Sequence, residues 1–389
     1  MAEETELIHV GMPKAADQLR AVTVGPVIQK GSTVLLPNAA ALYDDDAFIT
    51  YGRQGLSAHD ALRTALCKLE HAVAVELYPS GVAAISGAML AVLSAGDEVL
   101  VVDTIYKPTR RFCDSVLARY GVTTRYYDPA MSPHDLIGSA TASTRLIVLE
   151  SPGSLSFEMQ DLSGIAQLAK AKSILTLADN TWGASYLIKP LDHGIDISVQ
   201  ALTKYVGGHS DVFMGSAAAS DPEVARQLKD GVLHLGWAVS PEDTYQMLRG
   251  LRTLATRLDR HAQSGLAVAR WLSQQPEVLS VLHPALPGCP GHDLWRRDYS
   301  GSCGLFGFVL KPTSHQGVDA FLDALKVFGL GFSWGGFESL AISCDQQLKS
   351  RALSHTYGGP LMRLHIGLEH PDDLIADLRV GLDALTALA

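Results

Sequence analysis

Short apolar segments alternate with helical segments between residues 73 and 201, and this alternation constrains the fold more than any other feature. Helical spacing of apolar residues appears at residues 82–93, 109–120 and 165–170. Strands that alternate with helices in this way predict a mostly parallel sheet with helices on both faces, an α/β fold. The segments with the length and apolar content of buried strands are residues 73–77, 98–102, 122–127, 146–149, 174–178 and 197–201.

The pattern along the chain divides it into three regions. Residues 1–55 lack a strong period, so they are either disordered or an arm packed on another surface, and their apolar content favours the arm. A long helical region at residues 243–271 leads to further strands at 304–310 and 361–366. We therefore predict an arm that contacts a neighbouring subunit, a large domain and a smaller C-terminal α/β domain, at residues 1–55, 56–248 and 249–389.

Composition argues against several classes of protein. The 389 residues are 47% hydrophobic and 19% charged, which is enough for one large and one smaller domain. A net charge of −10 argues against a nucleic-acid partner. No positive segment leads into an apolar run at the N-terminus, and the apolar stretch 82–93 is too short to span a bilayer. The five cysteines are scattered, which fits reduced thiols in a cytoplasmic protein without a metal site.

Two residues at strand ends carry the candidate chemistry. Lys204 follows the strand at 197–201 and precedes a Gly-Gly turn, and Asp179 directly follows the strand at 174–178. Ligands of doubly wound α/β proteins bind outside the carboxyl ends of the strands. A lysine and an acid there suit pyridoxal phosphate (PLP), because the lysine bonds to the cofactor and the acid keeps its pyridine nitrogen protonated. Taken alone, a lysine such as Lys204 is usually a surface charge, and the structural alternative for Asp179 is a cap of the following turn.

Further residues supply contacts that PLP requires. The small-residue turn at 79–82 opens a helix whose free N–H groups and dipole suit a phosphate, although such turns are common without an anion. Tyr106 follows the strand at 98–102, where its ring either stacks on the pyridine or packs as an ordinary tyrosine. Tyr51 and Arg53 end the arm and fit a phosphate. The arm is poorly placed to reach the pocket of its own chain, so we expect Tyr51 and Arg53 to bind the phosphate in a neighbouring subunit.

Arg363 is a charge inside the otherwise apolar strand at 361–366. Such an arginine is rarely left unpaired. It is either one half of a structural ion pair or a bidentate clamp for a substrate carboxylate, and the sequence leaves both open.

Together these motifs resemble the PLP-dependent enzymes of cysteine and methionine transsulfuration, and most of all the bacterial β-lyases of that family. The resemblance implies the aspartate-aminotransferase-like fold (fold type I) and a carbon–sulfur β-lyase that cleaves L-cystathionine, an amino-acid thioether, to homocysteine, pyruvate and ammonia in methionine biosynthesis. The alternatives are a broad-specificity cysteine-S-conjugate β-lyase or cysteine desulfhydrase, a γ-elimination or γ-replacement enzyme, and a non-catalytic protein of the same fold. The resemblance is densest at residues 149–154, 179–182, 200–211, 249–254, 283–288, 333–340 and 363–369.

The resemblance also implies an assembly and the roles of individual residues. The implied assembly is a homotetramer made of two dimers with shared active sites, in which the partner subunit supplies Tyr51 and Arg53. Ala201 replaces a serine of many relatives, and Arg111 and Leu233 stand where some β-lyases have polar or acidic groups near the distal end of the substrate. The implied catalytic residues are Lys204 and Tyr106. The implied cofactor-binding residues are Lys204, Asp179, Tyr106, Gly81, Val82, Thr203, Tyr51 and Arg53, and the implied substrate-binding residues are Arg363, Ser333, Trp334 and Tyr51.

Overall fold

The structure is a computed structural model that describes residues 2–12, 23–44, 48–353 and 356–387. It contains a seven-stranded sheet with strand order β1-β7-β6-β5-β4-β2-β3. Five neighbouring strands run parallel, and β7 runs antiparallel to both of its neighbours, which confirms the predicted mostly parallel sheet. The strands are β1 (Ala74–Tyr78), β2 (Glu98–Val102), β3 (Thr123–Tyr127), β4 (Thr144–Glu150), β5 (Leu175–Asp179), β6 (Ile197–Gln200) and β7 (Gly215–Ala219).

Helices pack on this sheet and bury it. All five residues of β2 are buried, which explains why the strand is an uninterrupted apolar run after Glu98 rather than an alternating one. Ser80 caps α3 by accepting a hydrogen bond from the Ala83 N–H, so the helix begins directly after β1. The helical elements of this part are α2 (Ser57–Glu70), α3 (Gly81–Val92), α4 (Lys107–Phe112), the π-helical η3 (Cys113–Leu117), α5 (Pro133–Gly138), α6 (Leu162–Ala171), η4 (Pro190–His193), α7 (Pro222–Leu235) and α8 (Pro241–Leu251).

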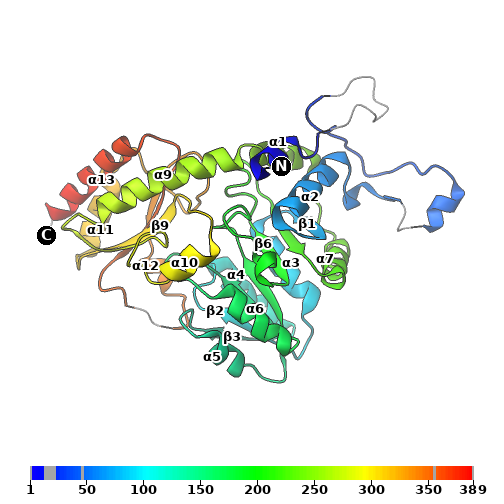
Figure 1. Cartoon of the computed structure of the whole chain (residues 1–389), viewed down its shortest axis with the longest axis horizontal. Helices are drawn as coiled ribbons and strands as arrows, with labels where there is room; N and C mark the ends of the chain where they lie inside the picture. The colour runs from blue at the N-terminus through cyan, green and yellow to red at the C-terminus, as the bar shows by residue number, and fades with distance from the viewer. Residues whose placement is uncertain (1, 13–22, 45–47, 354–355, 388–389) are drawn as a thin grey trace.

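A second, five-stranded sheet lies in the C-terminal part, in the order β10-β11-β12-β9-β8. The long helix α9 runs from the first sheet towards the second, where α11 and α13 lie side by side (Figure 1). The division of the chain into a large domain at residues 56–248 and a small domain at 249–389 stays a prediction. The elements are α9 (Leu254–Leu272), β8 (Val278–Leu282), α10 (His292–Asp298), β9 (Leu305–Leu310), α11 (His315–Ala324), β10 (Gly329–Leu330), β11 (Leu340–Ser343), α12 (Asp345–Leu348), β12 (Leu361–His365) and α13 (Pro371–Thr386).

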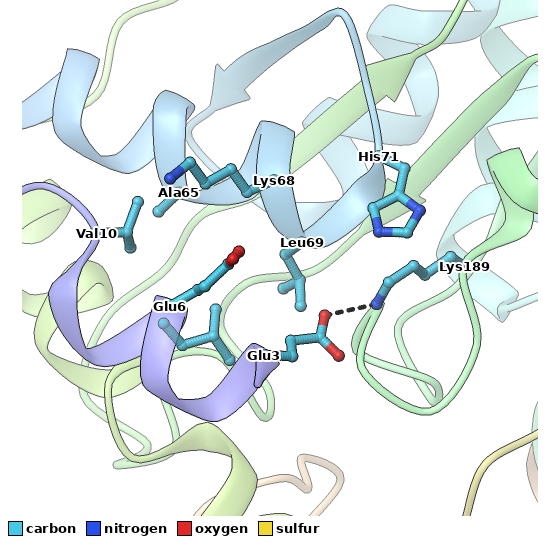
Figure 2. A pocket seen from close by; sticks show the side chains of 9 residues that line it. Glu3, Glu6, Val10, Ala65, Lys68, Leu69, His71 and Lys189 are labelled. Atoms are coloured by element: carbon cyan, nitrogen blue, oxygen red, sulfur yellow. Dashed lines mark hydrogen bonds and ion pairs between the residues drawn. The ribbon is translucent and has the colours of Figure 1, made fainter. Parts of the chain in front are cut away.

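The N-terminal helix α1 (Glu3–His9) packs on its own chain. Leu7 and Val10 are buried, and Glu3 forms an ion pair of 2.7 Å with Lys189. Figure 2 shows this pair beside Leu69 of α2, at a small cavity of about 270 Å³. The first residues of the predicted arm therefore anchor to the body of the same chain.

The following segment, described at residues 23–44 and 48–56, behaves differently. It contains only the short 3₁₀ turns η1 (Ala39–Tyr43) and η2 (Gly52–Gln54), and it reaches outward from the body (Figure 1). Its apolar side chains are strongly exposed, including Leu35 at 92% and Tyr43 at 88%. The body of the chain contacts this segment at only a few points, such as the hydrogen bond of 3.0 Å from Arg252 to the Val24 carbonyl, and leaves these side chains exposed.

The described residues hold no group of His, Cys, Asp or Glu arranged to bind a metal ion. None of the helices that the structure describes is long and apolar enough to cross a membrane. All five cysteines are free thiols.

Candidate active site

A cavity of about 590 Å³ lies at the carboxyl edge of the first sheet. It is walled by the start of α3, by the loops after β2, β4, β5 and β6, and by residues of the C-terminal part. Parallel strands deliver their carboxyl ends to one edge, so residues far apart in sequence meet there. The predicted site residues that line the cavity are Gly81, Val82, Tyr106, Asp179, Thr203, Lys204, Ser333, Trp334 and Arg363.

Lys204 is half-buried in this cavity. Its Nζ donates a hydrogen bond of 2.9 Å to Ser333 Oγ and lies 5.3 Å from the centre of the Trp334 ring. Burial and the nearby Arg363 lower the pKa of the Lys204 amine to about 8, although Asp179 opposes this shift. The amine can therefore exchange a proton near neutral pH, unlike a solvated lysine, which favours the functional interpretation over a surface charge.

Asp179 ends β5, and one of its two carboxylate oxygens already accepts hydrogen bonds from the same chain. Oδ1 accepts hydrogen bonds from the Thr181 backbone N–H at 3.1 Å and from Thr181 Oγ1 at 2.5 Å. The carboxylate thus caps the turn, as one of the two interpretations expected. Its other oxygen, Oδ2, makes no hydrogen bond within the described residues, so it can still face a protonated nitrogen. Burial raises the pKa of Asp179, while the Thr181 hydrogen bonds and Lys204 lower it.

Thr181 is a residue that the sequence analysis missed. Its Oγ1 donates to Asp179 and also accepts a hydrogen bond of 2.9 Å from the backbone N–H of Ala201. It therefore joins the end of β5 to the end of β6 and fixes the acid relative to the turn that carries Lys204. Its place two residues after Asp179, a spacing typical of Asx turns, was the available signal.

The start of α3 offers an anion site. The N–H groups of Gly81 and Val82 make no hydrogen bond within the described part of the chain, and the helix dipole adds positive charge there. A Cβ at position 81 would collide with the Cβ of Ala201, so only glycine allows α3 to begin against this turn. Thr203 also lines the cavity, but its hydroxyl donates to the Met214 carbonyl at 3.1 Å.

Arg363 is buried at 6% exposure on β12. Its Nη2 donates to the backbone carbonyls of Phe332 at 2.8 Å and Ser333 at 3.2 Å, and its Nε is buried without a partner. No carboxylate pairs with it among the residues that the structure describes. A structural ion pair is therefore not formed, and the guanidinium keeps donors for a carboxylate that enters the cavity.

Tyr106 lines the cavity at 42% exposure, and Glu150 lies behind it. Glu150 Oε2 accepts a hydrogen bond of 2.7 Å from the Tyr106 backbone N–H. Burial and the neighbouring Asp179 raise the pKa of Glu150 well above its usual range. Sequence analysis did not select Glu150 as a site residue, although it ends β4 by the same rule that selected Asp179.

Tyr51 and Arg53 are not brought to this cavity. Tyr51 is 49% exposed, and Arg53 Nη1 donates to the Leu233 carbonyl at 3.0 Å. Leu233 is also absent from the cavity lining, whereas Arg111 belongs to it.

The residues of the cavity fit PLP. The unpaired N–H groups on α3 suit its phosphate, and the amine of Lys204 suits its aldehyde. The remaining oxygen of Asp179 suits its pyridinium, which would neutralise a buried carboxylate. With the parallel sheet beneath them, these groups define a PLP-dependent enzyme of the aspartate-aminotransferase-like fold.

Comparisons with known proteins agree with this class. The chain belongs to the family described as Cys/Met metabolism PLP-dependent enzymes, whose family model matches residues 4–383. It is 41% identical to the cystathionine β-lyase of Bordetella avium, over 98% of this chain and 97% of that protein. It is 38% identical to the cystathionine β-lyase of Escherichia coli, over 97% of each chain. The structure also resembles a cystathionine γ-lyase from Lactobacillus plantarum, with a TM-score of 0.91 at 28% identity, over 99% of this chain and all of that one.

Proposed function

We propose that the chain is a carbon–sulfur β-lyase that cleaves L-cystathionine to homocysteine, pyruvate and ammonia. The observation that carries the proposal is the Lys204 amine, whose pKa is lowered to about 8. It shares the cavity with the buried Asp179 and with Arg363, which has no carboxylate partner within the described part of the chain. The β-lyase relatives also share more of this sequence than the γ-lyase of similar structure does.

The chain's own residues would bind the substrate, transfer the proton and position the reacting amine. Arg363 would hold the α-carboxylate, because it is buried beside the lysine with donors unused. The Lys204 amine would take the proton from Cα and return it to the leaving sulfur on Cβ. Ser333 would hold the amine in place through its hydrogen bond of 2.9 Å. Bound PLP supplies an electron sink for the pair left at Cα, and Asp179 would keep its ring nitrogen protonated.

The cofactor contacts follow from the same geometry. The N–H groups of Gly81 and Val82 would hold the phosphate, and the ring of Tyr106 would stack on the pyridine. Thr203 would join the phosphate site by turning its hydroxyl away from the Met214 carbonyl.

The arm supports an assembly with shared sites. Tyr51 and Arg53 lie outside the cavity of their own chain, on a segment whose apolar side chains the same chain leaves exposed. We therefore propose that they complete the phosphate site of a neighbouring subunit in a homotetramer of two dimers. The scattered free thiols fit a cytoplasmic location.

A product assay on L-cystathionine tests the reaction. The expected products are pyruvate and homocysteine in equal amounts. Formation of 2-oxobutyrate and cysteine would instead establish γ-elimination, and absence of any keto acid would support a non-catalytic protein. Comparable rates on cystathionine, on simple cysteine conjugates and on free cysteine would favour the broad-specificity lyase. Lys204→Ala serves as the inactive control.

A further inference from the structure

The segment at residues 332–336 comes from the C-terminal part of the chain and lies against Lys204. Ser333 accepts the hydrogen bond of 2.9 Å from the Lys204 amine, and the Trp334 ring is centred 5.3 Å from the same nitrogen. Gly335 has a φ of +86°, and a Cβ at this position would lie only 2.8 Å from the Lys204 carbonyl carbon. The position of the Lys204 side chain therefore depends on how this segment is held.

Two polar side chains of β12 hold the segment. Arg363 and His365 stand two positions apart, so they point to the same face of the strand. Arg363 holds the start of the segment through two backbone carbonyls. His365 Nε2 lies 3.0 Å from the backbone nitrogen of Gly335 and 3.1 Å from the carbonyl oxygen of Gly336. No other side chain among the described residues bonds to the backbone of these two glycines.

The ring of His365 is neutral and can make this contact in either tautomer. Burial and the neighbouring His261 lower the pKa of His365 well below its usual range. A neutral imidazole has one nitrogen that accepts a hydrogen bond and one that donates. In one tautomer Nε2 accepts from the Gly335 N–H, and in the other it donates to the Gly336 carbonyl. Both tautomers fix the same turn of the segment.

Packing alone does not account for a histidine at this position. His365 is fully buried, and its ring centre lies 5.3 Å from that of His261 and 6.0 Å from that of Tyr205. An apolar side chain of similar volume would fill this space without the cost of burying an imidazole. His261, by contrast, places its Nδ1 2.7 Å from the Ile366 carbonyl, at the end of β12 and away from the segment. The contact that requires the imidazole of His365 is therefore the one with the turn beside Lys204.

We propose that His365 is a positioning residue of the active site. By fixing the turn at Gly335, it holds Ser333 against the Lys204 amine and leaves Arg363 available for a substrate carboxylate. His365 does not belong to the cavity lining, so it acts through the segment rather than on the substrate. This role rests on the proposed β-lyase function.

His365→Gln and His365→Asn separate hydrogen bonding from packing. The glutamine amide reaches the place of Nε2, whereas the asparagine amide is one methylene shorter and ends near the place of Nδ1. We expect the Gln variant to keep about half or more of the wild-type kcat for pyruvate release from L-cystathionine. The Asn variant should lose about tenfold or more in kcat, with KM changed by less than about twofold because Arg363 is intact. In a Ser333→Ala background, where the amine has already lost its hydrogen bond, His365→Asn should lower kcat by less than about twofold.

Hydrogen exchange of the cofactor-free protein gives a readout that does not depend on activity. Peptides that cover residues 332–338 should exchange faster in the Asn variant than in the Gln variant. His365→Met, with an apolar chain of similar length, gives the same comparison if the Asn variant does not fold. His283→Asn is the matched control, since His283 is also fully buried, accepts from the Ala285 N–H and lies outside the cavity lining. It should leave both kcat and this exchange unchanged.

The outcomes separate the two proposals. Equal kcat in the Gln and Asn variants, or a further tenfold loss on top of Ser333→Ala, would overturn the positioning role of His365 even if pyruvate is formed. Absence of pyruvate from the wild type would instead refute the β-lyase proposal. The exchange of residues 332–338 would then still show whether His365 holds the segment.

Discussion

At the scale of single residues, Lys204 is costly to bury before the cofactor binds. Its pKa is about 8 in the folded chain and near 10.5 when solvated, so below pH 8 the folded state must hold an unfavourable ammonium. Between pH 8 and 10.5 the unfolded chain binds more protons, so stability rises with pH.

We predict that Lys204→Met stabilises the cofactor-free protein at pH 7 by roughly 2 kcal/mol, because an apolar chain replaces the buried ammonium. Urea unfolding of both proteins without PLP at pH 7 and 9.5 measures this difference, which should shrink at the higher pH. A less stable variant at pH 7 would contradict the assignment of burial as the cause of the lowered pKa.

Asp179 has two roles that one substitution can separate. Asn keeps an oxygen to accept the Thr181 hydrogen bonds but removes the charge opposite a pyridinium. We therefore expect Asp179→Asn to unfold near the wild-type midpoint while turnover falls by about a hundredfold or more. Asp179→Ala should lose the cap as well, at a cost of about 1 kcal/mol. The unfolding midpoint, the amount of bound PLP and the turnover, all measured on one preparation, distinguish the two roles. Normal turnover in the Asn variant would show that the charge of Asp179 is not needed for catalysis.

At the scale of elements, a buried polar network joins α2 to β6. Glu70, at the end of α2, is fully buried and accepts a hydrogen bond of 2.7 Å from Gln200, which also donates to Ser185. Burial raises the pKa of Glu70, so the folded chain keeps its proton at a pH where the unfolded chain releases it. The free energy of unfolding therefore falls as pH rises above the pKa of Glu70 in the unfolded chain, which is near 4.5.

Glu70→Gln should remove this loss, because an amide stays neutral and its oxygen can still accept from Gln200. We expect the free energy of unfolding of the variant to increase relative to that of the wild type as pH rises from 5 to 8. Chemical denaturation across that range measures the gain. Parallel stability curves would show that Glu70 is ionised in the folded protein.

Elements also show what the sequence could and could not predict. The β2 and β9 segments are apolar enough to be predicted within one residue of their observed bounds. β7 was missed, because Gly-Ser-Ala-Ala-Ala lacks the branched and aromatic residues typical of strands, although all five residues are buried. The helix expected at 109–120 begins earlier, at Lys107, and passes into a π-helical turn.

The site was predictable where strand ends decide it, as for Asp179 and Lys204. It was less predictable where contacts join distant residues. Tyr106 and Glu150 lie 44 positions apart, and Lys204 and Ser333 lie 129 apart. Spacing along the chain carries no trace of such hydrogen bonds. Only the family resemblance indicated Ser333 in advance.

At the scale of the whole molecule, the proposed shared site predicts complementation between defective chains. Arg53→Ala and Lys204→Ala should each be inactive alone. In a mixed dimer, one site receives both defects and the other receives neither, so co-expression should restore activity. Activity per mixed dimer, measured after purification by two different tags, is the readout. If Arg53 serves its own subunit, every mixed site is defective and no activity returns.

The exposed arm also has a consequence for the order in which the molecule is made. Its apolar side chains leave the ribosome before residues 57–389, which follow at about 5–20 residues per second over roughly twenty seconds to a minute. During that time the surface proposed to receive the arm does not yet exist on the same nascent chain. A fully folded copy of the chain nearby would cover the arm at once. Chains translated from the same messenger RNA would therefore assemble sooner than chains that meet only after release.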